Sequence, residues 1–200
     1  MKEILKLLLM IYQNNLKQER KIIIKNNKIN KPNKNEYKVC FIGGSGIGAK
    51  TSLIDAIMGK KFDFNILSTS NNSFVVKSIE LNNEIIGLNL WDTIGQEKFR
   101  ALSKIFIKDS DFIVFGFDVA SKSSFEGIKD WYKIVNENCN TKLMYLIGNK
   151  IDLFMDRQVN EEKARNLAKE LVLRYHETSC LTGEGIYNFV YDLANVIIKY

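Results

Sequence analysis

Apolar and polar positions form alternating blocks along the 200-residue chain, and these blocks predict strands and helices in turn. Six segments have the apolar character and the length of strands: 37–42, 74–81, 85–91, 112–118, 142–147 and the short 175–177. Five others have helical periodicity or helix-start signals: 50–58, 97–104, 125–137, 161–175 and 186–200. The chain is therefore predicted to alternate between strands and helices.

This order of elements predicts an α/β fold with a mostly parallel, six-stranded sheet and helices on both faces. The strands at 74–81 and 85–91 are joined by Asn82-Asn83, a pair typical of tight hairpin turns, so we expect one antiparallel hairpin at an edge. In sheets of this class, ligands bind at the carboxyl ends of the strands.

Composition separates a basic N-terminal extension from the rest of the chain. Residues 1–36 are rich in Asn and Lys, and 37–200 are expected to form the domain. Of the net charge of +6, residues 1–35 carry +7, so the remainder is near neutral and a nucleic-acid-binding face is not expected. The apolar patch Ile4–Tyr12 is too short to span a membrane. It fits either a flexible tail or an amphipathic helix at a membrane surface.

The cysteines and the single histidine do not suggest a metal centre. Cys40, Cys139 and Cys180 are scattered without metal-ligand spacing, which fits reduced thiols in a cytosolic protein. His176 has no cysteine or acidic cluster nearby in the sequence, so we expect it to be structural or exposed.

A glycine-rich turn follows the first predicted strand and leads into the first predicted helix. Backbone N–H groups in such a turn, together with the helix N-terminus, attract phosphate. Lys50 would reach the outer phosphates, and the Thr51 hydroxyl would bind Mg²⁺. The match to the phosphate-loop pattern is imperfect: Ala49 precedes the lysine where glycine is usual, and the first glycine is either Gly43 or Gly44, depending on the direction of counting. A generic strand-to-helix turn is the alternative.

A second polar motif follows the strand at 85–91. Asp92 would hold Mg²⁺ through water, Gly95 would offer its N–H to a γ-phosphate, and Gln96 would orient an attacking water. The alternative for an isolated Asp-Thr pair at this position is a helix cap.

Two further loops carry the chemistry of base recognition. Asp152 can accept two hydrogen bonds from the edge of guanine, which adenine does not offer, while Lys150 would lie along the base and Asn149 would brace the loop. In the last loop, the N–H groups around Ser179 and Cys180 would contact the guanine carbonyl. An ordinary polar loop is the alternative there.

Together these motifs resemble the Ras superfamily of small GTPases and, within it, the Rab family, over about residues 36–200. The resemblance implies the P-loop NTPase fold and a GTP or GDP site with Mg²⁺. It assigns Phe62 to packing on guanine, and Thr69 to Mg²⁺ and the γ-phosphate. The metal residues are thus Thr51, Thr69 and Asp92. The implied nucleotide contacts are Gly44, Ser45, Gly46, Ile47, Gly48, Ala49, Lys50, Thr51, Ser52, Phe62, Thr69, Gly95, Asn149, Lys150, Asp152, Ser179, Cys180 and Leu181.

The resemblance also implies a surface for partner proteins. Phe74, Trp91 and Phe106 match three aromatic residues that Rab proteins present to effectors, although core packing is the alternative. An exchange factor, a GTPase-activating protein and effectors are implied as partners of a monomer that is cytoplasmic or peripheral on endomembranes.

Several positions depart from the family pattern. Ala49 stands before Lys50 in place of glycine, and the loop holds one extra residue when it is counted from Gly43. Ile94 replaces a small residue beside the γ-phosphate, and Leu181 replaces a lysine of the last loop. The given sequence ends at Tyr200 within the last helical pattern, without the terminal cysteines that carry the family's prenyl anchor. Membrane association is therefore left open.

The sequence thus predicts a Rab-like GTPase with a slow intrinsic rate, because no arginine finger is evident in the chain. Two alternatives stay open. A scaffold that binds nucleotide with little or no hydrolysis is suggested by Ala49 and Ile94, whereas Gln96 argues against it. An ATPase would require the Asp152 contact to be irrelevant.

Overall fold

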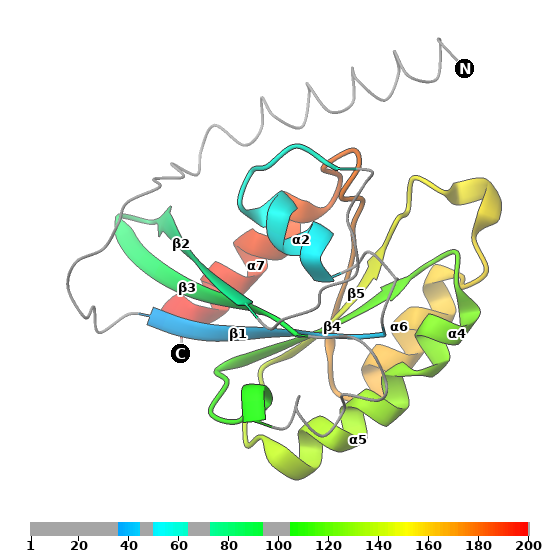
Figure 1. The fold of residues 1–200 in the computed structure, drawn as a ribbon, viewed down its shortest axis with the longest axis horizontal. Coiled ribbons are helices and arrows are strands. Elements are labelled where there is room, and N and C mark those ends of the chain that lie inside the picture. Colours follow the sequence, from blue (N-terminus) through cyan, green and yellow to red (C-terminus); the bar gives the residue numbers. More distant parts are fainter. Residues whose placement is uncertain (1–35, 45–49, 64–72, 94–104, 200) are drawn as a thin grey trace.

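The computed structural model describes residues 36–44, 50–63, 73–93 and 105–199. In them a six-stranded sheet has the order β2–β3–β1–β4–β5–β6 (Figure 1). Neighbouring strands are parallel except in the β2–β3 hairpin, so the expected α/β class is confirmed. The strands are β1 (Glu36–Ile42), β2 (Ser73–Leu81), β3 (Glu84–Asp92), β4 (Phe112–Asp118), β5 (Met144–Asn149) and β6 (Arg174–Glu177).

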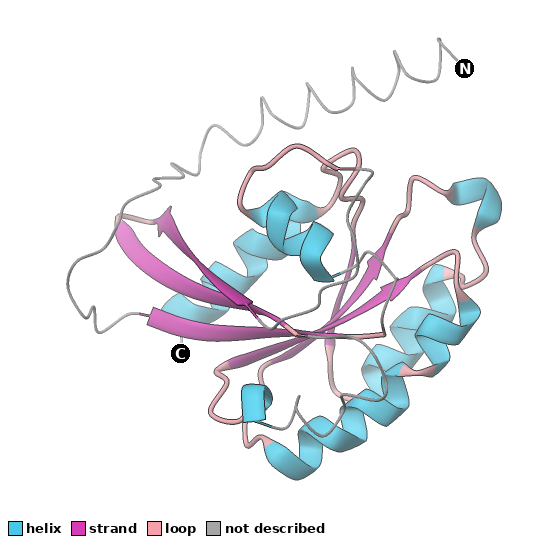
Figure 2. Ribbon diagram, viewed as in Figure 1, coloured by secondary structure: helices cyan, strands magenta, loops and turns pink. Residues whose placement is uncertain are grey.

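Helices cover both faces of the sheet, as Figure 2 shows. One layer contains α2 and α7, and the other contains α4, α5 and α6. None of the helices in the described ranges is long and apolar enough to cross a membrane. The helices are α2 (Lys50–Ile57), α4 (Lys122–Glu126), α5 (Ile128–Asn138), α6 (Glu161–Glu170) and α7 (Ile186–Lys199), with a short 3₁₀ helix η3 (Phe154–Asp156).

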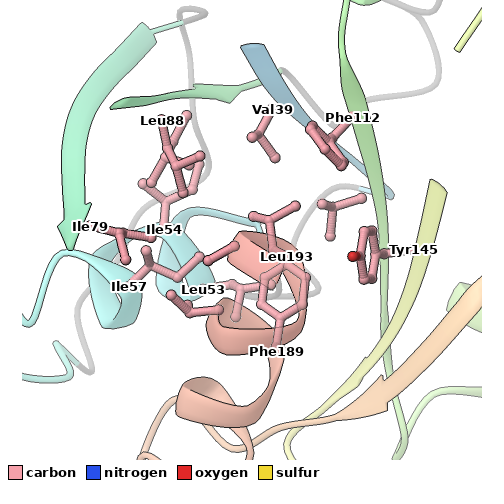
Figure 3. Packing of buried hydrophobic residues seen from close by; sticks show 14 of the residues in the cluster. Val39, Leu53, Ile54, Ile57, Ile79, Leu88, Phe112, Tyr145, Phe189 and Leu193 are labelled. Atoms are coloured by element: carbon pink, nitrogen blue, oxygen red, sulfur yellow. The ribbon is translucent and has the colours of Figure 1, made fainter. Parts of the chain in front are cut away.

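Two hydrophobic clusters hold these layers together. Because side chains alternate along a strand, Val39 and Phe41 of β1 join the cluster under α2 and α7, while Cys40 joins the one under α4, α5 and α6. Figure 3 shows the first cluster, in which Leu193 of α7 packs between the sheet and α2. Strands β4 and β5 are buried along their whole length, which explains their continuous apolar runs.

The hairpin turn forms where the sequence predicts it. Asn82 and Asn83 join β2 to β3 with φ angles of 53° and 66°. These left-handed conformations are those of the tight turn whose twist matches antiparallel strands, and asparagine tolerates them better than most residues do.

The helix expected at 125–137 is instead two helices. It starts earlier, at α4, because the Ser121 side chain accepts a hydrogen bond from the N–H of Ser124 and caps the helix. It is interrupted at Gly127, which both ends α4 and precedes α5. The predicted single helix was therefore wrong in its start and its continuity.

Two other elements differ from the prediction by two residues or more at an end. Helix α6 ends at Glu170 rather than at 175, because Val172 adopts a left-handed conformation and Arg174 begins β6. Strand β5 covers 144–149 rather than 142–147, so Gly148 and Asn149 are part of the strand. The helix expected at 97–104 lies outside the described residues.

Candidate functional site

The carboxyl ends of β1, β3, β4 and β5 bring polar residues to one edge of the sheet. Register pairing places Phe41 of β1 beside Asp92 of β3, and Asp118 of β4 beside Asn149 of β5. These residues are far apart in the sequence. This is the edge at which a ligand was predicted.

The first part of the site lies where β1 leads toward α2. Lys50 is the first residue of α2, and its ammonium Nζ donates to the carbonyl oxygens of Gly43 at 3.0 Å and Gly44 at 2.9 Å. Gly43 is required here, because a Cβ on it would lie 2.5 Å from the carbonyl oxygen of Gly116 in β4. Both glycines considered as the start of the loop thus contact the lysine.

A hydroxyl and a carboxylate meet beside this lysine. The Thr51 hydroxyl donates to Oδ2 of Asp92 at 2.6 Å, joining α2 to the end of β3. Asp92 is 5% exposed. Next to it, the Thr93 hydroxyl donates to the carbonyl oxygen of Phe41 at 2.6 Å and fixes the end of β3 against β1. Ser52 is buried in α2.

Hydroxyl and carboxylate oxygens are the hard ligands that Mg²⁺ prefers. Thr51 and Asp92 are therefore suited to hold Mg²⁺, the first as a ligand and the second directly or through water. Thr69, the third predicted metal residue, lies outside the described residues. The donor set that the structure does describe fits the ion.

The second part of the site is built around Asn149, which is 1% exposed. Its Oδ1 atom accepts from the Thr178 hydroxyl at 3.1 Å, from the Cys180 N–H at 3.2 Å and from the Cys180 thiol at 3.3 Å. The Ser179 hydroxyl donates to Oδ1 of Asp152 in a short hydrogen bond. The two loops predicted to bind guanine are thus hydrogen-bonded to one another.

The last loop has its own internal hydrogen bonds. The N–H of Ser179 donates to the carbonyl oxygen of Glu184 at 2.9 Å, and the N–H of Thr182 donates to the Ser179 hydroxyl at 3.1 Å. Burial raises the pKa of the Cys180 thiol to about 12, so this cysteine is not a nucleophile at neutral pH. Leu181 is half-buried.

The segment from η3 to β6 supports this loop. The Arg157 guanidinium forms two hydrogen bonds with the Glu177 carboxylate, at 2.9 and 2.8 Å, and the Tyr175 hydroxyl donates to the same carboxylate at 2.7 Å. Glu177 immediately precedes Thr178. This ion pair therefore fixes the start of the last loop.

Two residues of the site were missed as candidates. The carboxylate of Asp118 lies 2.6 Å from the ammonium of Lys150, and the buried hydroxyl of Thr178 orients Asn149. Both are polar residues at or just after the end of a strand, the signal that identified Asp92 and Asn149. That signal could have found them.

The aromatic residues predicted to face effectors come together. The ring of Phe74 stacks on Trp91 with centroids 4.8 Å apart, and Phe106 lies 6.1 Å beyond it. Phe74 is 54% exposed, whereas the other two are half-buried. Phe62, predicted to pack on the base, is 36% exposed after α2.

The remaining predicted residues lie outside the described ranges, so their placement is not described. They are Ser45, Gly46, Ile47, Gly48, Ala49, Thr69, Gly95 and Gln96.

The chain is similar to known proteins over most of its length. The model of the Ras family matches residues 38–199. The Ras-related protein SEC4 of Saccharomyces cerevisiae is 33% identical over 161 residues, which cover 80% of this chain and 74% of the relative. Rab-13 of Rattus norvegicus is 32% identical over a match that covers 81% of this chain and 80% of the relative. Rab-27B of Bos taurus is 34% identical over a match that covers 81% of this chain and 79% of the relative.

Proposed function

Because this chain belongs to the Ras family, as a divergent Rab-like small GTPase, we propose that it binds GTP and GDP with Mg²⁺, hydrolyses GTP and acts as a switch in vesicle traffic. The observation that carries the proposal is the hydrogen-bonded unit of the two base loops. In it, Asn149 is held by Thr178 and Cys180 while Asp152 is held by Ser179.

The phosphate end of the proposed site uses Lys50, Thr51 and Asp92. Lys50 now donates to two carbonyl oxygens, and the same ammonium would exchange these for phosphate oxygens when nucleotide binds. Bound Mg²⁺ would supply positive charge that neutralises the phosphates. Thr51 and Asp92 would hold the ion, with Thr69 joining them in the GTP state.

The base end of the site would select guanine. The carboxylate of Asp152 can accept two N–H groups from the guanine edge, and Ser179 limits its rotation. The side chains of Phe62 and Lys150 would pack on the two faces of the guanine ring. The apolar side chain of Leu181 would also pack on the base. The N–H groups of the last loop would donate to the guanine carbonyl.

Hydrolysis and switching are assigned to residues outside the described ranges. Gln96 would orient the attacking water, and Gly95 would donate to the γ-phosphate. Loss of that phosphate would release the two segments that contact it, one around Thr69 and one around Gly95 and Gln96. The exposed stack of Phe74 on Trp91, with Phe106, would serve as the effector surface. An exchange factor and a GTPase-activating protein would set the rates of a monomer that is cytoplasmic or peripheral on endomembranes.

The competing proposal is a Rab-like scaffold that retains its nucleotide unhydrolysed. The observation that favours it is the sequence at Ala49 and Ile94, which replace small residues of the family pattern beside the phosphates. The two proposals share the whole binding site. They differ only in whether bound GTP becomes GDP.

The base site is tested by competition between nucleotides. In Asp152→Asn, an amide N–H faces the guanine N–H groups, so we expect GDP affinity to fall roughly 100-fold or more, while ADP gains nothing. Xanthosine diphosphate, which presents a carbonyl at that edge, should bind the variant better than GDP does. Equal competition by ADP and GDP for the wild-type chain would contradict the proposal and favour an ATPase.

A further inference from the structure

Lys150 has an unusual backbone and a fixed side chain. Its φ of 66° is left-handed, a conformation in which lysine is rare and which must be stabilised by its surroundings. Its ammonium lies 2.6 Å from Oδ2 of Asp118. The Lys150 side chain is 33% exposed and that of Asp118 only 10%, so this pair is partly removed from water, unlike a typical surface ion pair.

Asp118 is itself held on several sides. It is the last residue of β4 and pairs in register with Asn149. Its Oδ1 atom accepts from the N–H of Ala120 at 2.8 Å, which leaves Oδ2 directed at Lys150. Its own N–H donates to the Ser124 hydroxyl at 3.1 Å. The carboxylate therefore has a fixed position before any ligand binds.

We propose that Asp118 is a positioning residue, which holds Lys150 in place for the guanine base. The proposal rests on the function proposed above. A free lysine stem samples many rotamers, and ordering it costs binding free energy, so a stem already held by Asp118 reduces that cost. The pair has a second effect: it keeps the Lys150 ammonium away from Asp152, two residues further on, whose carboxylate guanine requires.

A double-mutant cycle tests this role in the full chain. The variants are Asp118→Asn, Lys150→Met and the two together, and the readout is the dissociation rate of a fluorescent GDP. We expect Asp118→Asn to release GDP about tenfold faster, because the lysine is no longer held. The double variant should release GDP as fast as Lys150→Met alone, since Asp118 acts through Lys150. The dissociation rates of GTP from the variants, relative to the wild type, should equal those of GDP, because the Asp118–Lys150 pair acts on the base, which both nucleotides share.

The matched control is Glu170→Gln, which makes the same kind of charge change in the exposed pair with Lys129, at 2.7 Å. Its GDP release should equal that of the wild type. Asp118→Glu keeps a carboxylate within reach of the lysine and should stay within about threefold of the wild type. It also tests the role if Asp118→Asn does not fold.

Two results would overturn the positioning role: additive effects in the double variant, or an unchanged rate in Asp118→Asn. Thermal unfolding of every variant shows whether a faster release reflects global instability. A wild-type chain that does not bind GDP at all would instead overturn the proposed function, and the positioning role with it.

Discussion

At the scale of single residues, the site depends on hydroxyl groups that join separate elements. Thr51 joins α2 to β3, Thr178 joins the two base loops and Ser179 holds Asp152. Thr51 lies in α2, whereas Thr178 and Ser179 lie in the last loop, and all three are small polar side chains. Their contribution comes from where the fold places them.

Thr51→Val removes one such hydroxyl with little change in shape. We expect GDP release in Mg²⁺ to become roughly tenfold faster, because the ion loses an oxygen ligand, and EDTA to have little further effect. The rate of GDP release with and without EDTA measures this.

Thr141→Val is the matched control for that variant. It removes a hydroxyl that donates to the carbonyl oxygen of Asp111 at 2.6 Å, before β5 begins and so at the other end of the sheet. It should lower stability by about 1 kcal/mol and leave the EDTA response intact. An equal EDTA response in Thr51→Val would exclude its role at the ion.

At the scale of elements, the sequence predicted the class of each described strand and helix better than its ends. The ends depend on local hydrogen bonds that periodicity does not report. Ser121 starts α4 through a side-chain cap, and Asn160 caps α6 in the same way by accepting from the N–H of Lys163. The start of α6 was predicted correctly at residue 161, where a strong helical pattern begins, whereas α4 starts at Lys122 and not at the predicted residue 125.

The same limit applies to the site. Lys50, Thr51 and Asp152 were predicted from short motifs whose chemistry is local in the sequence. The strand-end position of Asp118 was visible in the sequence, but its contact with Lys150, which lies 32 positions further along the chain, was not. Sequence spacing alone does not report such a contact.

The end of α6 offers a test of backbone strain. Val172 has a φ of 57° and is 83% exposed, while its N–H and that of Leu173 donate to Lys169 and Ala168 in a typical helix-ending motif. Glycine normally occupies this position. Val172→Gly should therefore raise stability by about 1 kcal/mol, which is a melting temperature about 2–4 °C higher.

Gly59→Ala is the reverse change at a similar backbone conformation. Gly59 has a φ of 75°, and no atom lies within 4 Å of an added Cβ, so only the backbone changes. This variant should lose about 1 kcal/mol. Val172→Gly would contradict the strain argument if it melted at or below the wild-type temperature.

At the scale of the whole molecule, ion pairs connect β6 to the elements around it. Arg157 before α6 binds Glu177, and Arg174 binds Asp192 of α7 through two hydrogen bonds at 2.8 and 2.7 Å. Burial alone would raise the pKa of Glu177, but hydrogen bonds from Arg157 and Tyr175 outweigh it, and the net pKa is lowered.

This lowered pKa predicts how stability depends on pH. The ionised Glu177 stabilises the fold above its unfolded pKa of about 4.5, and this contribution disappears as the pH falls through the lower folded value. Glu177→Gln should therefore be less stable than the wild type at pH 7. This gap in stability between the two proteins should shrink below pH 4.5. Urea unfolding midpoints at pH 7 and pH 3 measure this gap. A gap that is as large at pH 3 would contradict the assignment.

The proposed switch is a property of the whole chain, because it needs the phosphate end, the base end and the hydrolytic glutamine together. Its most direct test is a single turnover of GTP on the purified full chain with Mg²⁺, in which bound nucleotide is extracted and quantified over hours. We predict slow conversion of bound GTP to GDP, abolished in Gln96→Leu, with GTP still bound in that variant. GTP that stays bound and unchanged in the wild type would contradict the enzyme and favour the scaffold.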